Sequence, residues 1–155
     1  MTHAAASSRQ AAEQARALFT EGMAQHQRGR LNDAKDLYRR VLRICPQQAD
    51  AAHMLGVAEF QLGRFAEAEC LISRALASRP NDALAHFNLG NALRELGRLD
   101  AAERAYLSSL QWRPDDVETL KNLGNVLKEQ NRLDEAIAVY DRVLALHPDH
   151  HHTRY

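Results

Sequence analysis

Apolar residues recur at spacings of three and four through most of the chain, which predicts amphipathic helices. The clearest case has one helix over residues 82–96 and a second over residues 100–112. Asn81 or Asp82 would cap the first helix, and Gly97 would follow its end in a left-handed conformation. The second helix would stop before Pro114, because proline disfavours helical geometry in the residue that precedes it. Two such helices form an antiparallel hairpin, and no segment alternates as a strand would, so the predicted fold is all-α.

This hairpin pattern repeats along the chain with a period of 34 residues. The residues that recur at this spacing are Gly22, Gly56, Gly90 and Gly124; Ala34, Ala68, Ala102 and Ala136; and Pro46, Pro80, Pro114 and Pro148. Gly29, Gly63 and Gly97 keep the same spacing, and Asn131 stands in the fourth place. The period predicts four helix–turn–helix blocks over residues 15–48, 49–82, 83–116 and 117–150. A period of this length indicates a solenoid in which neighbouring blocks bury one another's apolar faces.

Small residues explain how each hairpin closes. Gly90 on the first helix of its block and Ala102 on the second lack bulk, so the two helix axes can approach closely. We expect larger residues, Tyr106 among them, to fill the space around that contact.

The two ends of the chain differ from the blocks. Residues 1–14 are predicted to be an N-terminal segment that partly extends the first helix, which would begin near Ser8 because Ser7 and Gln10 have capping-box spacing. Residues 151–155 resemble the start of a truncated fifth block. An apolar stripe that includes Ile137 and Leu144 has no following block to cover it. Either the chain is a piece of a longer protein, or another copy of the chain covers this stripe. We expect self-association through this uncapped C-terminal repeat.

Composition narrows the range of partners and of locations. The chain has 155 residues with 20 basic and 20 acidic side chains, and this balance argues against nucleic-acid or anionic-membrane binding through bulk charge. No uncharged apolar stretch is long enough to cross a membrane, and the first residues contain no apolar core of a secretory signal. The two cysteines cannot build a disulfide framework and suit a reducing compartment. The predicted location is the cytoplasm.

No motif for catalysis occurs in the sequence. Phosphate-loop, nucleophile-elbow and zinc-protease signatures are all missing, so we expect no catalytic residue and no cofactor. Cys45 and Cys70 are interpreted as small hydrophobic residues rather than nucleophiles. The run from His150 to His152 lies in a polar tail and lacks the ligand spacing of a structural zinc site, so no metal is predicted.

The repeating residues identify a family resemblance. The chain resembles the tetratricopeptide repeat family in its Leu-Gly pairs, its recurring alanines and prolines, and Tyr38, Tyr106 and Tyr140. The resemblance covers nearly the whole chain and implies a right-handed superhelical solenoid of four repeats, with the first helix of each repeat lining a concave groove. The repeats at 83–116 and 117–150 are also similar to those that precede the catalytic domain of O-linked N-acetylglucosamine transferases, a likeness that suggests a bacterial protein.

The same resemblance implies a peptide-binding groove. By position, its residues would be Phe60, Phe87, Asn88, Asn91, Arg94, Lys121, Asn122, Asn125 and Lys128. Asparagine amides can bind the backbone of an extended peptide without reading its sequence. The resemblance assigns an apolar wall to Phe60 and Phe87, and Lys121 and Lys128 would favour acidic ligand residues. In the alternative interpretation the asparagines are solvated or bind within the stack, and Phe87 only packs between helices.

Two functions follow from this reading. The first is a non-catalytic scaffold that binds a protein or peptide of unknown identity in the groove. The alternative is the substrate-recognising arm of a larger glycosyltransferase whose catalytic domain would lie downstream of Tyr155.

Overall fold

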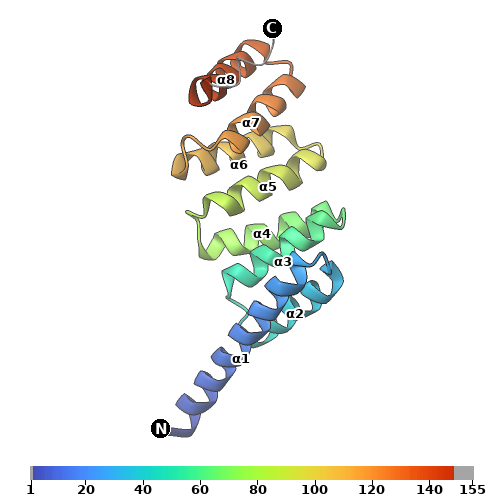
Figure 1. Ribbon diagram of the computed structural model, residues 1–155, viewed down its shortest axis with the longest axis vertical. Helices are drawn as coiled ribbons and strands as arrows, with labels where there is room; N and C mark the ends of the chain where they lie inside the picture. The colour runs from blue at the N-terminus through green and yellow to red at the C-terminus, as the bar shows by residue number, and fades with distance from the viewer. Residues whose placement is uncertain (1, 149–155) are drawn as a thin grey trace. The chain divides into compact units, whose positions relative to one another are not determined.

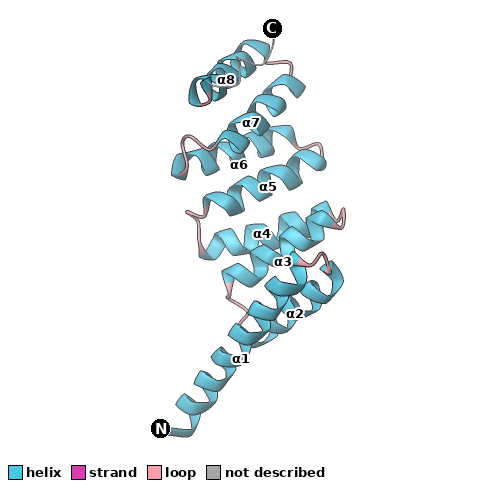
Figure 2. Cartoon of the chain, in the orientation of Figure 1, coloured by secondary structure: helices cyan, strands magenta, loops and turns pink. Residues whose placement is uncertain are grey.

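The computed structural model describes residues 2–148, and this part of the chain is all-α, as predicted (Figures 1 and 2). It contains eight helices and no strand. The helices are α1 (Thr2–Gln27), α2 (Leu31–Ile44), α3 (Ala49–Gln61), α4 (Phe65–Ser78), α5 (Ala83–Glu95), α6 (Leu99–Trp112), α7 (Val117–Glu129) and α8 (Leu133–Leu146). None of these helices combines the length and the apolar content needed to cross a bilayer.

The helices belong to two compact units, which divide between Pro80 and Asn81. In the first unit α1 packs on α2, α2 on α3 and α3 on α4, around buried residues such as Tyr38 and Leu55. In the second unit α5 packs on α6, α6 on α7 and α7 on α8. The core of the second unit gathers Leu93, Tyr106 and Leu123 from three successive helices. Within each unit, therefore, every helix is held mainly by its neighbours in sequence, as in other helical-repeat proteins.

The recurring glycines make room for a ring or side chain on the partner helix. A Cβ at Gly22 would lie 2.7 Å from Cε1 of Tyr38, and one at Gly124 would lie 2.6 Å from Cε1 of Tyr140. At Gly56 the neighbour is Ile72, whose Cγ1 would lie 2.6 Å away. Each of these glycines thus leaves room for the large side chain of the facing helix. The recurring alanines of the second helices are also buried: Ala34, Ala68, Ala102 and Ala136.

Helix ends follow the predicted capping chemistry. The side chain of Asp82 accepts a hydrogen bond of 3.0 Å from the N–H of Ala85, so Asp82, rather than Asn81, caps α5. Asp116 caps α7 in the same way, through the N–H of Thr119 at 2.9 Å. Gly97 follows α5 with a φ of 72°, as predicted, and Asn131 follows α7 with a φ of 62°, so asparagine takes the left-handed conformation in the fourth position.

The first helix begins earlier than predicted. It starts at Thr2, so Ser7 and Gln10 lie inside α1 and do not form a capping box at its start. Alanine occupies positions 4, 5, 6, 11 and 12, and its high helix propensity carries the helix through the whole segment. The predicted opening of a fifth block at residues 151–155 lies outside the described residues.

Candidate functional site

The predicted groove residues of the second unit lie on α5 and α7, which also contact each other directly. We define the α5–α7 face by the residues Phe87, Asn91, Arg94, Asn122, Asn125 and Glu129. Phe87, Asn91 and Arg94 are spaced by four and three residues, so they share one side of α5. Asn122, Asn125 and Glu129 have the matching spacing on α7.

Two asparagines and a tyrosine form the centre of this face. The hydroxyl of Tyr106 on α6 donates a hydrogen bond of 2.7 Å to Oδ1 of Asn91. Nδ2 of Asn122 donates a second bond, of 3.0 Å, to the same oxygen. The predicted pair Asn91 and Asn122 is therefore brought together, and its amides bind each other across the two helices.

An ion pair forms the next contact along the two helices. Nε of Arg94 donates to Oε1 of Glu129 at 2.8 Å, and Nη2 of the same guanidinium donates to that oxygen too. The hydrogen bond with Glu129 raises the pKa of Arg94 above its ordinary value. Because Arg94 is neutralised by this carboxylate, it contributes little net charge to the face.

Asn125 repeats the arrangement of Asn91 one block later. The hydroxyl of Tyr140 on α8 donates a hydrogen bond of 2.6 Å to Oδ1 of Asn125. Both asparagines are only partly buried. Their amide oxygens thus hold a tyrosine hydroxyl, while the rest of each amide lies at the edge of the packed helices.

A cavity of about 420 Å³ lies beside Phe87, where α5 and α7 begin. Leu84 and Phe87 form its apolar side, and Arg113, Glu118 and Thr119 contribute its polar side. The ring of Phe87 also packs against Tyr106, with ring centroids 6.2 Å apart. Phe87 therefore both packs within the unit and lines a space large enough for an apolar side chain.

The remaining predicted site residues occupy other positions. Lys121 and Lys128 are exposed on α7, and Nζ of Lys121 lies 3.0 Å from Oε1 of Glu118. Asn88 is partly buried on α5. Phe60 belongs to the first unit, where its ring contacts Phe65 with centroids 5.3 Å apart.

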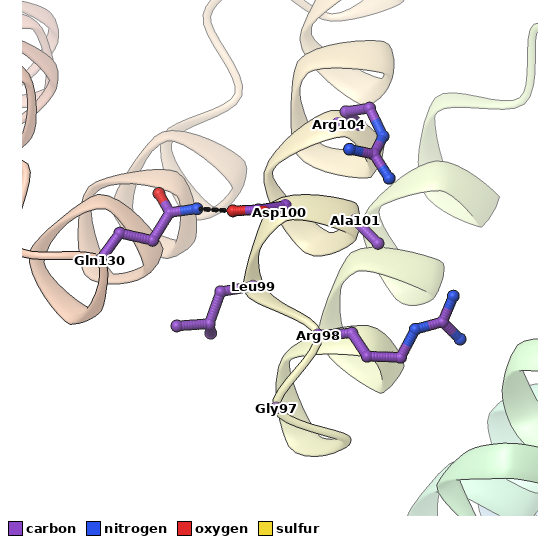
Figure 3. A pocket seen from close by; sticks show the side chains of 7 residues that line it. All are labelled: Gly97, Arg98, Leu99, Asp100, Ala101, Arg104 and Gln130. Atoms are coloured by element: carbon purple, nitrogen blue, oxygen red, sulfur yellow. Dashed lines mark hydrogen bonds between the residues drawn. The ribbon is translucent and has the colours of Figure 1, made fainter.

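A second depression in this unit lies away from the α5–α7 face. It has a volume of about 490 Å³ and surrounds the start of α6, from Gly97 to Arg104. Figure 3 shows Gln130 reaching across to Asp100, and its Nε2 donates to the carboxylate at 2.7 Å. This hydrogen bond links the residue that follows α7 to α6. The depression is therefore a feature of the packing around the turn between α5 and α6.

Few side chains among residues 2–148 are candidates for metal binding or for nucleophilic chemistry. No cluster of three or more histidine, cysteine or acidic side chains there is arranged to hold a metal ion. Cys45 is partly buried, as suits a small hydrophobic residue, but Cys70, which was interpreted in the same way, is exposed. The run from His150 to His152 lies outside the described residues.

Sequence reasoning missed the tyrosines as partners of the asparagines. Tyr106 and Tyr140 were recognised only as recurring aromatic residues that pack. Each lies 15 residues after the asparagine that it binds, and this separation was visible in the repeat. The same separation joins Tyr38 to Met23, whose sulfur accepts the Tyr38 hydroxyl at 3.3 Å.

Several solved structures share this arrangement of helices. A crystal structure of MamA superposes with a TM-score of 0.83 at 23% identity, covering 85% of this chain and 77% of that one. MamA from Desulfovibrio magneticus superposes with a TM-score of 0.82 at 20% identity, covering 85% of this chain and 75% of that one. YrrB, described as a TPR protein with an unusual peptide-binding site, gives a TM-score of 0.80 at 25% identity, covering 88% of this chain and 70% of YrrB. No curated protein matches the sequence at a significant level.

These likenesses define the chain as an all-α helical-repeat protein. Three models of the tetratricopeptide repeat match its sequence, over residues 15–48, 53–117 and 93–155. The chain belongs to the tetratricopeptide repeat family. Proteins of this fold are scaffolds for protein interaction, and the role of this chain is of that kind.

Proposed function

We propose that the chain is a non-catalytic scaffold that binds an extended peptide, or an extended segment of a protein partner, along the α5–α7 face. The observation that carries this proposal is the contact between Asn91 and Asn122. It fixes two amides side by side on neighbouring helices while both residues remain partly exposed. Fixed amides can bind a peptide backbone without the entropic cost of ordering them first.

The cavity beside Phe87 supplies a second element of the site. Its apolar side, formed by Leu84 and Phe87, suits one apolar side chain of the ligand. A peptide that reaches from this cavity to Asn91 would follow α5 for about one turn, because Phe87 and Asn91 are four residues apart. Asn88, Lys121 and Lys128 flank that path in this proposal. Phe60 would belong to a separate contact in the first unit.

The comparison with YrrB supports the proposal at the level of function. YrrB carries a peptide-binding site and shares 25% of its residues with this chain over most of both lengths. We therefore infer the same class of ligand for this chain.

The proposal is tested by selecting ligands from a random dodecapeptide display library on the whole chain. The dissociation constant of a selected peptide is then measured for the wild type and for the double variant Asn91→Ala/Asn122→Ala. We expect the double variant to bind about tenfold more weakly, because it loses two polar contacts of ordinary strength. Circular dichroism before and after heating shows whether the variant is folded.

A matched control is Gln111→Ala, an exposed residue of α6 that is not part of the α5–α7 face. This control should bind as the wild type does. If the library yields no peptide, or if the folded double variant binds as tightly as the wild type, the proposal is wrong.

The other predictions about function stay open to separate tests. The glycosyltransferase-arm alternative stays a prediction, because none of the likenesses described above tests it. Sequencing the reading frame beyond Tyr155 tests it directly. The cytoplasmic location and the bacterial source also stay predictions.

A further inference from the structure

We propose that the α5–α7 face selects peptide segments rich in hydrogen-bond acceptors, and that the hydroxyls of Tyr106 and Tyr140 set this selectivity by occupying the amide oxygens of Asn91 and Asn125. This inference rests on the proposed function, since it names the chemistry of the ligand at the same site. The preferred ligand groups are backbone carbonyls and the carboxylates of aspartate and glutamate.

The first step concerns the amide of Asn91. An asparagine side chain offers one oxygen with two acceptor positions and one nitrogen with two N–H donors. At Asn91 the Tyr106 hydroxyl and Nδ2 of Asn122 both donate to the oxygen, at 2.7 and 3.0 Å. Both acceptor positions are thereby used, and what Asn91 can still offer a ligand is a pair of N–H donors.

The amide of Asn125 is oriented in the same way, with its oxygen bound to a tyrosine. Its oxygen accepts the hydroxyl of Tyr140 at 2.6 Å. A bond this short holds the amide in one orientation, with the nitrogen turned away from the tyrosine. Asn125 therefore presents its N–H groups as well, one helical turn along from Asn122.

These N–H groups are open to a ligand. Among residues 2–148, no acceptor takes a hydrogen bond from Nδ2 of Asn91 or of Asn125. No described side chain has a fully buried polar atom without a partner, so both nitrogens reach the surface. Asn122 adds an acceptor oxygen between them, but the donors outnumber it.

Two of the three cations beside the peptide path add little net charge to the face. Arg94 is paired with Glu129, and Lys121 is paired with Glu118. Arg94 and Lys121 are therefore each balanced by a nearby carboxylate. Lys128, exposed on α7, has no carboxylate partner among the described residues, and the comparison of low and high salt separates the effect of its charge from that of the amides. Selection for acceptor groups on this face would come mainly from the orientation of the asparagine amides, whose N–H groups face the ligand.

Tyr106 keeps its role as a donor at neutral pH. Tyr106 is fully buried, and burial raises the pKa of its hydroxyl well above the ordinary value. The hydroxyl thus stays protonated and continues to donate to Asn91. Replacing either tyrosine by phenylalanine removes the donor without changing the charge and keeps the ring that packs against Gly90 or Gly124.

The experiment uses the whole chain and a random dodecapeptide display library. Selected peptides are synthesised in two forms, one with its aspartates and glutamates and one with asparagine and glutamine in their places. We expect enrichment of acidic residues and about tenfold tighter binding of the acidic form by the wild type, since charge-assisted bonds from N–H donors are the stronger ones.

The deciding variant is Tyr106→Phe/Tyr140→Phe, measured with both peptide forms at low and at high salt. In this variant the oxygen of Asn125 is released, and the oxygen of Asn91 keeps only the bond from Asn122. Both amides therefore have an acceptor position to offer a ligand, and that of Asn125 can also rotate. The ratio of the dissociation constants of the two peptide forms should therefore fall from about tenfold to about threefold or less. The matched control is Tyr38→Phe, which removes the hydroxyl at the same repeat position in the first unit, where it meets Met23 instead of an amide. This control should keep the full preference.

The possible results separate this inference from the proposed function. If no peptide binds, or if binding ignores Asn91→Ala/Asn122→Ala, the proposed function fails. If peptides bind through those asparagines but show no acidic preference, only the inference fails. It fails also if the preference survives Tyr106→Phe/Tyr140→Phe, or if high salt alone abolishes it, because charge would then set the selectivity.

Discussion

Nζ of Lys35 lies 3.0 Å from Oε1 of Glu59, and these two side chains, on α2 and α3, are only 4% and 3% exposed. Nη2 of Arg39 reaches the same carboxylate oxygen at 3.1 Å from a more exposed position. Nη1 of Arg64 lies 3.5 Å from Oε2 of Glu59, so this buried carboxylate contacts three cations in all. It joins the first hairpin to the second within the first unit. Removing one partner would leave the other charge buried and unpaired, which is far more costly than losing a surface ion pair.

We therefore expect Glu59→Ala to lower the free energy of unfolding by about 3–5 kcal/mol. Urea denaturation followed by circular dichroism measures the change. Glu67→Ala, at an exposed position of α4, is the control and should change stability by less than about 0.5 kcal/mol. The double variant Lys35→Met/Glu59→Leu should be more stable than Glu59→Ala alone, because it removes both charges together; a result in the opposite order would contradict this account.

A methyl group at position 90 should destabilise the second unit. A Cβ at Gly90 would lie 2.5 Å from Cε1 of Tyr106, and the buried ring has little room to move. We expect Gly90→Ala to lower the free energy of unfolding by about 1–3 kcal/mol through overpacking, although alanine is the better helix former. Chemical denaturation of the whole chain gives this value.

The control for this prediction is a double-mutant cycle with Tyr106→Ala. Without the ring, Gly90→Ala should become neutral or stabilising, because only helix propensity remains. Additive effects of the two substitutions would show that the ring is not the cause.

Alkaline pH should weaken the first unit through Tyr38. Burial raises the pKa of its hydroxyl to about 12, whereas in the unfolded chain it ionises near its ordinary value of about 10. The stabilising contribution is therefore complete below about pH 10 and is lost as the pH rises towards 12. We expect the urea midpoint to fall over this window, and to fall less steeply in Tyr38→Phe. Equal slopes for the two proteins would contradict the assignment to Tyr38.

Self-association through α8 stays a prediction, and the exposure of its side chains supports it. Leu133, Ile137 and Leu144 are 52%, 56% and 43% exposed and share one side of the helix. We expect concentration-dependent association in sedimentation-equilibrium experiments, and its loss in Ile137→Glu, which places a charge in the stripe. Leu107→Glu, at an exposed leucine of α6, is the control and should associate as the wild type does. A monomeric wild type at high micromolar concentration would rule the prediction out.

The sequence predicted the local features of the fold well because they depend on local chemistry. Asp82 caps α5 because a short carboxylate reaches the first free N–H groups of the helix that follows it. Asn131 takes the left-handed conformation of Gly97 because both residues tolerate positive φ. The predicted start of α1 is wrong because the helix propensity of the surrounding alanines carries the helix past the capping motif at Ser7.

The candidate site was predicted only in part. The period relates Asn122 to Asn88 and Asn125 to Asn91, but the contact between Asn91 and Asn122 depends on how α5 and α7 pack. The bond from Tyr106 to Asn91 depends on the depth to which the ring enters beside Gly90. Such distances are set by tertiary packing, and no spacing along the chain measures them.

The helices, most of their ends, the repeat and the family could all be predicted from the amino-acid sequence, because a 34-residue period with glycine, alanine and proline in fixed places fits one way of packing helical hairpins. Tertiary structure alone decided which atoms of the asparagines remain available to a ligand. A side-chain amide has a donor end and an acceptor end, and which end is used internally depends on the groups that the fold brings against it. At Asn91 and Asn125 those groups are tyrosine hydroxyls from neighbouring helices.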